Sequence, residues 1–245
     1  MQPILELRGI YFKYSSAEDY VLKGLDFKIE QNQRIGIIGA NGEGKTTLLH
    51  LCVGLITPQK GTIFFHGEQI KSSKQFAKLR KEIGLVFQNP DDQLFSPTVL
   101  EDVAFGPLNL GLSPDKAKQR AMWALEVVGL SGMEDRITTK LSGGEKKLLS
   151  LATIIAMKPR VLLLDEPTTG LAPATRETII NLINDLPMDF VIVSHDWDFL
   201  YRTTNSLYVM DKGRLIETDR SVLHQHFHVH PYGDVPHEHP EKKLA

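Results

Sequence analysis

The stretch that decides the fold is GANGEGKT, residues 39–46, which fits the pattern G-x-x-x-x-G-K-[ST]. A buried, β-rich run comes directly before it at residues 34–38, and an apolar segment with helical character follows at residues 46–54. Glycines in such a loop let backbone N–H groups surround a polyphosphate at the N-terminus of a helix. A structural glycine turn is the alternative, but the strand and helix around the loop favour a phosphate site.

The positions of this loop have distinct expected roles. Lys45 is expected to reach the β- and γ-phosphates of a nucleoside triphosphate, and Thr46 to contact Mg²⁺. The side chain of Glu43 is an unfavourable neighbour for phosphates, so we expect it to point outward while its N–H stays with the loop. The candidate nucleotide-binding residues of this segment are Gly39, Asn41, Gly42, Glu43, Gly44, Lys45, Thr46 and Thr47.

A second motif, VLLLDE at residues 161–166, is an apolar strand that ends in two carboxylates. The pair lies beside the phosphate loop if the two strands are neighbours in a parallel sheet. Asp165 is then expected to hold Mg²⁺ through water, and Glu166 to orient and deprotonate the attacking water. A capped strand end is the alternative; the presence of the phosphate loop in the same chain favours the functional interpretation.

The rest of the chain predicts an α/β protein. Alternation indicates short strands at residues 4–8 and 25–29. Residues 89–141 change character, with prolines separating segments that look helical, notably residues 115–128, and we interpret them as an inserted helical subdomain. From residue 142 onward strands and helices alternate again, which implies a parallel sheet with helices on its faces.

Composition narrows the function classes. The 245 residues have a formal net charge of −2, which makes DNA or RNA an unlikely partner. The longest stretch free of Lys, Arg, Asp and Glu, residues 46–59, is shorter than the roughly 20 residues that cross a bilayer. Residues 1–6 lack the pattern of a secretory signal, and the single cysteine, Cys52, excludes an intramolecular disulfide. We therefore expect a cytoplasmic protein without a membrane span.

The third motif, LSGGE at residues 141–145, makes the interpretation specific. Ser142 and Glu145 form a capping-box pattern, S-x-x-E, and a capped helix start with two glycines is also an anion site. Together the three motifs resemble the ATP-binding-cassette (ABC) ATPases over about residues 3–217. The resemblance implies a P-loop nucleotide-binding core with an N-terminal antiparallel β subdomain and a helical subdomain inserted at about residues 89–152.

The family pattern also implies roles for single residues. The element that binds the γ-phosphate of the ATP held by the opposite subunit comprises Ser142, Gly143, Gly144 and Glu145. Tyr14 is expected to stack on adenine, with a core role as the alternative. Gln88 is expected to touch Mg²⁺ and to report to the membrane partner. His195 is expected to contact the γ-phosphate, although a histidine after a strand is often only a surface residue.

The sequence departs from the family at two positions. Glu145 stands where glutamine is usual, which keeps the size and adds a charge near the nucleotide. Ala172 stands where the family has an aspartate that contacts the phosphate loop of the facing subunit. The second departure concerns the coupling between the two ATP sites and leaves the chemistry intact.

The resemblance implies that ATP hydrolysis and transport are carried out by different subunits. Hydrolysis requires a dimer with two ATP molecules between the subunits, formed as a homodimer or as a heterodimer with a second ABC ATPase. The work is done on separate integral membrane subunits, reached through the helical insertion, so the protein is expected to be peripheral on the cytoplasmic face of the cell membrane. DNA-repair ATPases with coiled-coil insertions and two-cassette translation factors do not fit this chain.

Residues 87–107 are similar to the ATPases of energy-coupling-factor importers, which take up vitamins or cobalt and nickel ions. Residues 218–245 form a histidine-rich tail. Its imidazoles suit nickel, cobalt or zinc, so one hypothesis is that the tail binds or senses the imported metal. A solvated tail without a role, a vitamin importer and a metal-binding module whose ATPase is secondary are the alternatives. The tail histidines are His224, His226, His228, His230, His237 and His239.

Overall fold

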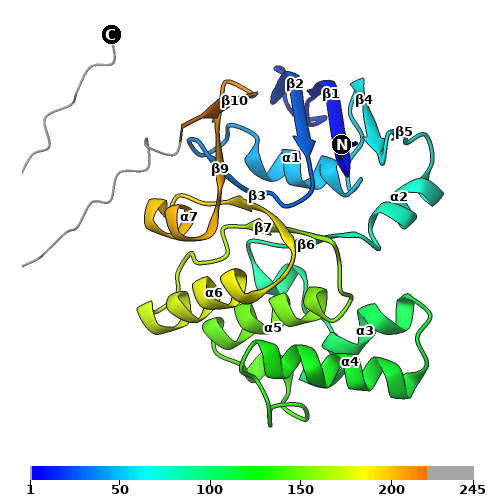
Figure 1. Cartoon of the computed structure of the whole chain (residues 1–245), viewed down its shortest axis with the longest axis vertical. Coiled ribbons are helices and arrows are strands. Elements are labelled where there is room, and N and C mark those ends of the chain that lie inside the picture. Colours follow the sequence, from blue (N-terminus) through cyan, green and yellow to red (C-terminus); the bar gives the residue numbers. More distant parts are fainter. Residues whose placement is uncertain (1, 220–245) are drawn as a thin grey trace, which may run out of the picture.

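The computed structural model describes residues 2–219, whose strands form two sheets (Figure 1). The first is antiparallel with the strand order β2-β1-β4-β5, and the second has the order β10-β9-β3-β8-β7-β6. The strands are β1 (Leu5–Phe12), β2 (Leu22–Ile29), β3 (Arg34–Ile38), β4 (Lys60–Phe65), β5 (Glu68–Gln69), β6 (Ile83–Val86), β7 (Val161–Asp165), β8 (Asp189–Val193), β9 (Ser206–Asp211) and β10 (Arg214–Thr218). The helices are α1 (Lys45–Cys52), α2 (Ser73–Leu79), α3 (Val99–Asn109), α4 (Pro114–Val127), α5 (Gly143–Ile155), α6 (Pro173–Asp185) and α7 (Trp197–Thr203), with short 3₁₀ turns η1 (Pro90–Asp92) and η2 (Thr138–Lys140).

The N-terminal antiparallel sheet confirms the β subdomain that the resemblance implied. Its strands are longer than predicted, because β1 continues to Phe12 and β2 begins at Leu22. Gly9, with a φ of 59°, lies where the register between the two strands shifts. This bulge breaks the alternation of buried and exposed side chains without ending the pairing, which is why the pattern alone stopped too early.

The six-stranded sheet is parallel from β6 to β9, as predicted, except for its edge strand β10. β9 and β10 are joined by Lys212 and Gly213, with φ values of 47° and 75°, and such a two-residue turn forces antiparallel pairing. β7 is buried along its whole length: Leu162 and Leu164 pack into one core and Val161 and Leu163 into the other. Burial on both faces explains its continuous apolar run.

Two hydrophobic cores therefore flank this sheet. One core lies between the sheet and helices α3 to α7. The other includes α1 and the antiparallel sheet, and Figure 1 shows α1 between the two sheets. The helices α3, α4 and α5 pack on one another between β6 and β7 in the chain, as the predicted helical insertion required. None of the helices within residues 2–219 has the length and apolar character needed to span a membrane.

Candidate functional site

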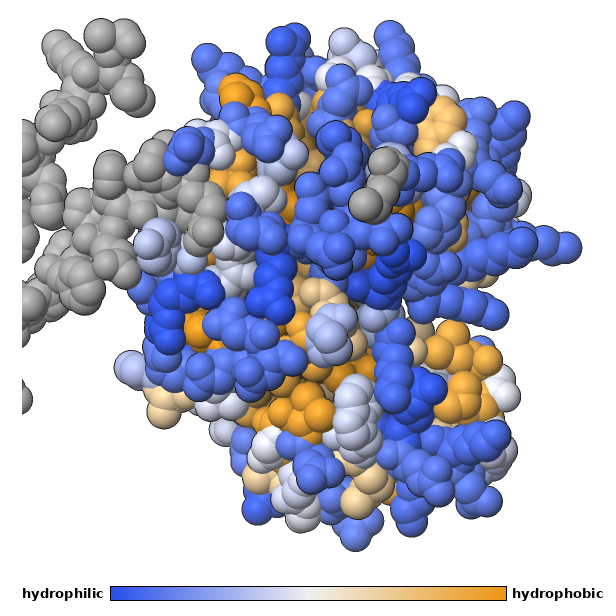
Figure 2. All heavy atoms as spheres, viewed as in Figure 1, coloured by the Kyte–Doolittle hydropathy of each residue, from blue (hydrophilic) through white to orange (hydrophobic). Residues whose placement is uncertain are grey.

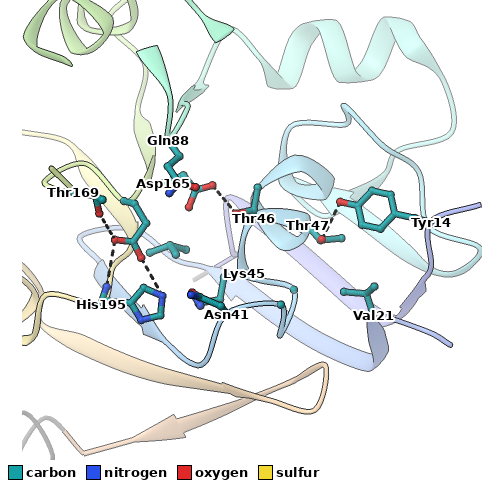
Figure 3. Close-up of a pocket in the computed structure, with 14 residues that line it drawn as sticks. Tyr14, Val21, Asn41, Lys45, Thr46, Thr47, Gln88, Asp165, Thr169 and His195 are labelled. Atoms are coloured by element: carbon teal, nitrogen blue, oxygen red, sulfur yellow. Dashed lines mark hydrogen bonds and ion pairs between the residues drawn. The ribbon is translucent and has the colours of Figure 1, made fainter. Parts of the chain in front are cut away.

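A cavity of about 470 Å³ opens where the phosphate loop meets the carboxyl ends of the parallel strands (Figure 3). Its residues come from segments far apart in the sequence, and most of the predicted nucleotide-site residues are among them. The lining comprises Tyr14, Val21, Asn41, Gly42, Gly44, Lys45, Thr46, Thr47, Gln88, Asp165, Glu166, Thr169, Val193 and His195. Two predicted residues, Gly39 and Glu43, belong to the same loop without lining the cavity.

The shape of the loop requires glycine at two of its positions. Gly44 precedes α1 with a φ of 102°, and a Cβ there would lie 2.7 Å from the side chain of Leu22. A Cβ on Gly39 would lie 2.5 Å from the carbonyl oxygen of Met210. Both positions exclude a side chain, so the glycine pattern in the sequence reports real steric limits.

Lys45 is buried, and its ammonium group forms hydrogen bonds with the backbone of the phosphate loop. Its Nζ donates to the carbonyl oxygens of Gly39 at 2.7 Å and Ala40 at 2.8 Å. Burial lowers the pKa of Lys45, while the nearby carboxylates of Glu166 and Asp165 act in the opposite direction. A cation at the start of a helix that also points free N–H groups outward suits an anionic ligand.

Thr46 and Asp165 meet across the sheet. Thr46 Oγ1, in the first turn of α1, donates to Asp165 Oδ2 at 2.7 Å. The carboxylate thus reaches the phosphate loop without the direct strand adjacency that the sequence argument assumed, since β8 lies between β3 and β7. The other carboxylate oxygen, Asp165 Oδ1, is buried without a hydrogen-bond partner. Burial raises the pKa of this carboxyl, and the charge of Glu166 adds to the rise. A buried, partly unsatisfied carboxylate beside a hydroxyl is a donor set that fits Mg²⁺.

Glu166 is held from one side and open on the other. Thr169 Oγ1 donates to Glu166 Oε2 at 2.9 Å, whereas Oε1 is buried without a hydrogen-bond partner. His195 Nε2 lies 3.5 Å from that Oε1, an ion pair when the imidazole is protonated. Glu166 also has a φ of 46°, a strained conformation for a non-glycine residue. Glu166 lines the cavity, with one carboxylate oxygen held by Thr169 and the other beside the His195 imidazole.

Tyr14 and Gln88 lie at opposite sides of this cavity (Figure 3). The Tyr14 hydroxyl is 3.0 Å from Thr47 Oγ1, and the ring packs edge-on against Phe12 at a centroid distance of 5.0 Å. The Tyr14 residue is 42 % exposed, so it is not a core residue. Gln88 follows β6 and extends its side chain beside Asp165.

The LSGGE element lies apart from these residues. The capping box predicted for Ser142 and Glu145 is present: Glu145 Oε2 accepts from the Ser142 N–H at 2.7 Å, and the Ser142 hydroxyl accepts from the Glu145 N–H at 3.3 Å. None of the cavity-lining residues belongs to residues 141–145. Ser142 and Gly143, at this helix start, are exposed on the surface.

A scan against family models matches residues 22–169 to the family described as "ABC transporter". The chain belongs to the ABC transporter family. This confirms the predicted family, the fold class and the ATP-hydrolysing activity, because the matched part is the ATPase domain of such transporters.

The chain is similar to several curated proteins of this family, among them ATPases named for energy-coupling factor transporters. It is 44% identical over 217 residues to the energy-coupling factor transporter ATP-binding protein EcfA of Methanothermobacter thermautotrophicus, covering 87% of this chain and 70% of the relative. A putative ABC transporter ATP-binding protein of Nitratidesulfovibrio vulgaris is 48% identical and covers 98% of this chain and 88% of its own length.

Solved structures of ABC ATPases also resemble the chain. The cbiO1 protein of Clostridium perfringens, described as part of the ABC transporter complex cbiONQ, superposes with a TM-score of 0.77 at 37% identity, covering 88% of each chain. The ATP-binding cassette MJ0796, solved as a dimer in a post-hydrolysis state with ADP and Pi, has a TM-score of 0.80 at 25% identity, covering 88% of this chain and 98% of that one.

Three residues of the ABC ATPase cavity escaped the sequence analysis: Val21, Thr169 and Val193. Thr169 had a signal, because it stands three residues after Glu166, where a hydroxyl can reach back to the carboxylate. Val21 and Val193 had none beyond their place next to strand ends. The tail histidines lie outside the described residues, and residues 2–219 contain no group of three or more His, Cys, Asp or Glu side chains placed to hold a metal ion.

Proposed function

We propose that this cavity binds Mg²⁺ and ATP and hydrolyses the nucleotide to drive an importer of the energy-coupling-factor type. The observation that carries the proposal is that one cavity brings Lys45, Thr46, Asp165, Glu166 and His195 together. The lysine supplies positive charge for the β- and γ-phosphates, and the loop N–H groups at the start of α1 add to it. Tyr14 supplies a ring face for the adenine.

Mg²⁺ would be held by Thr46, Asp165 and Gln88. When bound, it neutralises phosphate charge and so assists transfer of the γ-phosphoryl group to water. The unpartnered Asp165 Oδ1 supports this assignment, since a buried carboxylate oxygen without a partner costs stability unless a cation satisfies it.

Glu166 would act on the attacking water. Thr169 fixes Oε2, which leaves Oε1 free to accept a proton from a water molecule in line with the γ-phosphate. His195, next to the same oxygen, would contact the γ-phosphate. Charge that develops during transfer is then met by Lys45 on one side and by His195 on the other.

The site would be completed in trans. Ser142, Gly143, Gly144 and Glu145 do not reach the chain's own cavity, yet they form a capped helix start suited to an anion. A two-fold pair places this element of one chain over the phosphate loop of the other. The pair is either two copies of this chain or this chain with a second ABC ATPase, and the dimeric state described for MJ0796 supports such an arrangement.

Mixing two inactive variants tests this shared site. Lys45→Ala removes the phosphate-binding lysine, and Ser142→Arg blocks the helix start. In a mixed pair one site has both defects and the other has none, so an equimolar mixture regains roughly a quarter of wild-type ATPase activity. No regain, despite formation of mixed dimers, would contradict a site completed in trans. The same mixtures with a second ABC ATPase distinguish homodimer from heterodimer.

A membrane subunit would dock on the helical insertion. An apolar area lies over α3 (Figure 2), and Phe95, Phe105 and Leu108 are 66%, 45% and 45% exposed. The Phe95 and Phe105 rings pack edge-on at 4.7 Å, and the buried Asp102 carboxylate accepts from the Phe95 and Ser96 N–H groups. These contacts hold Phe95 in place while most of it stays exposed. An apolar segment of the membrane protein would suit this surface.

Phe95→Asp tests that surface. We expect the variant to keep its ATPase activity while co-purification with the integral membrane subunits falls by tenfold or more, about the effect of losing one aromatic anchor of 1.4 kcal/mol or above. Leu55→Asp is the control, since Leu55 is 51% exposed outside the helical insertion. Loss of ATP-dependent dimers instead would assign the surface to a second copy of the chain.

The imported substrate is proposed to be cobalt or nickel ions. The histidines of residues 218–245 support this choice over a vitamin. Imidazole is a good ligand for both metals, so the tail would bind Ni²⁺ or Co²⁺. Calorimetry that compares the full chain with a chain ended near Glu217 decides the point: equal nickel affinity of the two would contradict it.

The proposal also assigns the parts of the chain and its place. Residues 1–217 form the ABC ATPase domain with the helical subdomain at about residues 89–152, and residues 218–245 form the tail. With its work done on integral membrane subunits, the ATPase would be peripheral at the cytoplasmic face of the cell membrane. Fractionation of cells with and without these subunits tests this location.

A further inference from the structure

Lys147 is a buried cation that the catalytic scheme above does not use. It lies in α5 with 2% of its surface exposed, and no ion pair given for residues 2–219 includes it. Its Nζ donates instead to two consecutive backbone carbonyls, that of Gln88 at 2.7 Å and that of Phe87 at 3.3 Å. Burial lowers the pKa of Lys147 to about 8, against the opposing effect of the Asp165 and Glu166 carboxylates. Burying an ammonium group is costly, so an apolar residue would suit mere packing better.

The segment that Lys147 grips is fastened to α5 a second time. Gln93 Nε2 donates to the Ser150 carbonyl and to Thr153 Oγ1, both at 2.7 Å, and Gln93 Oε1 accepts from the Phe87 N–H at 3.1 Å. The backbone from residue 87 to residue 93 is thus tied to one helix at both of its ends. Because hydrogen bonds from a charged donor are stronger than those between neutral groups, the lysine end is the stronger tie.

The hydrogen bonds of Lys147 join two parts of the ATPase that have different proposed roles. Gln88 lines the chain's own cavity beside Asp165. α5 begins at Gly143 and its N-cap Ser142 lies five residues before Lys147, so about 7.5 Å along the helix axis separate the clamp from the helix start proposed to meet the partner's nucleotide. Through Lys147, a displacement of this helix start would be passed on to the Gln88 backbone.

We infer that Lys147 is a positioning residue: its ammonium fastens the Phe87 and Gln88 carbonyls to α5, so that Gln88 keeps its place beside Asp165 and moves with the helix that begins at Ser142. The inference rests on the proposed function, because it gives Gln88 a position relative to Mg²⁺ in one site and Ser142 a ligand in the other.

The test compares three variants of the full chain. Lys147→Met keeps the length of the side chain and removes every donor. Lys147→Arg keeps donors and should behave largely like the wild-type chain. Lys146→Met is the matched control, because the neighbouring Lys146 contacts the same segment only through an exposed ion pair with Asp91 at 2.7 Å. If Lys147→Met does not fold, Lys147→Gln, which retains one amide donor group, takes its place.

Two measurements are needed. Amide hydrogen exchange without nucleotide should become about tenfold faster at residues 87–93 in Lys147→Met, since local opening is favoured when the clamp is lost. The Mg²⁺ concentration for half-maximal ATPase activity should rise about tenfold, as for other groups that orient metal ligands, while the ATP affinity measured without Mg²⁺ stays within twofold.

The outcomes separate cleanly. Wild-type exchange rates in Lys147→Met overturn the inference, and so does faster exchange with an unchanged Mg²⁺ requirement, since the lysine would then be only structural. A wild-type chain without ATPase activity counts against the proposed function, whereas the exchange measurement needs no hydrolysis and still reports on the clamp.

Discussion

Thr46 Oγ1 and Asp165 Oδ2 are joined by a 2.7 Å hydrogen bond that spans the central sheet from the first turn of α1 to the end of β7. The bond brings the phosphate loop and the carboxylate strand to one point although β8 runs between β3 and β7. It also leaves Asp165 Oδ1 as the oxygen without a partner. The proposed Mg²⁺ site is therefore built around one hydroxyl and one carboxylate.

Replacing this hydroxyl should weaken the metal site more than the fold. Thr46→Val keeps the shape of the side chain and removes the donor to Asp165, so we expect the Mg²⁺ concentration for half-maximal ATPase activity to rise roughly 10- to 100-fold. Thr46→Ser keeps the hydroxyl and should stay within about threefold of wild type by the same measure. Equal Mg²⁺ requirements for Val and Thr at position 46 would remove this residue from the site.

The aromatic ring of Tyr14 should matter more than its hydroxyl. Tyr14→Ala removes the proposed stacking surface for adenine and should weaken ATP binding by about 1–3 kcal/mol, or roughly 5- to 150-fold, whereas Tyr14→Phe keeps the ring and should lose little. Thr47→Val controls for the 3.0 Å contact between the two hydroxyls. Binding of ATP and of a bare triphosphate, measured by calorimetry, would show the effect only for ATP; an equal loss for both ligands would contradict stacking.

Replacing Ala172 by aspartate, the residue that the family has at this position, should stabilise the protein. It is the N-cap of α6 and makes no side-chain capping bond, so Ala172→Asp should accept a hydrogen bond from the first turn and stabilise the protein by about 1 kcal/mol. For a chain of this size that is a rise in Tm of roughly 2–4 °C. By the same N-cap ranking Ala172→Gly should recover most of that gain, within a few tenths of a kcal/mol of the Asp variant, and an Asp variant no more stable than the wild-type chain would refute the capping argument.

Arg176 links α6 to the segment that carries His195, and its loss should have a defined pH dependence. It donates to Asp196 at 2.6 and 2.9 Å and to Asp198 at 2.7 Å. Burial alone would raise the pKa of Asp196, but the hydrogen bonds from Arg176 and the Phe199 N–H outweigh it and the pKa is lowered. Arg176→Met should cost about 1–2 kcal/mol at pH 7, reduced from the value for a buried pair because Asp196 is partly exposed.

The sign of this pH effect follows from the lowered pKa. The stabilisation is complete above the unfolded-state pKa of Asp, about 3.9, and is lost as the pH falls through the lower folded-state pKa. Urea unfolding should therefore show a constant difference between wild type and Arg176→Met from pH 7.5 to 5, and a shrinking one below pH 4. A difference that already halves between pH 7 and 5 would point to another group.

Sequence patterns identified those parts of the site that are continuous in the chain. The loop around Lys45, the carboxylates after β7 and the capped helix at Ser142 each carry their chemistry within a few residues, so each was recognisable locally. The placement of β8 between β3 and β7 was not, because strand order depends on tertiary packing that no short segment encodes. β9 and β10 were also missed, since β10 is mostly exposed and lacks an apolar pattern.

Contacts between segments far apart in the sequence were harder to predict than motifs that are continuous in the chain. Thr169 lies close enough to Glu166 in the chain for its hydroxyl to be suspected, but Lys147 grips residues that precede it by about 60 positions. Its only local signal is a lysine on the buried face of α5, one turn before Leu151. The role of a buried lysine without a carboxylate partner can be recognised only when the backbone carbonyls that it contacts are known.

The structure of the Glu166→Gln variant with ATP bound tests the central claim most directly, because this substitution should remove the proposed base and leave the phosphate-binding residues in place. The account predicts that each γ-phosphate lies between Lys45 of one chain and the helix start at Ser142 of another, whether a second copy or a related ATPase. An ATP enclosed by a single chain, with residues 141–145 far from every phosphate, would contradict it.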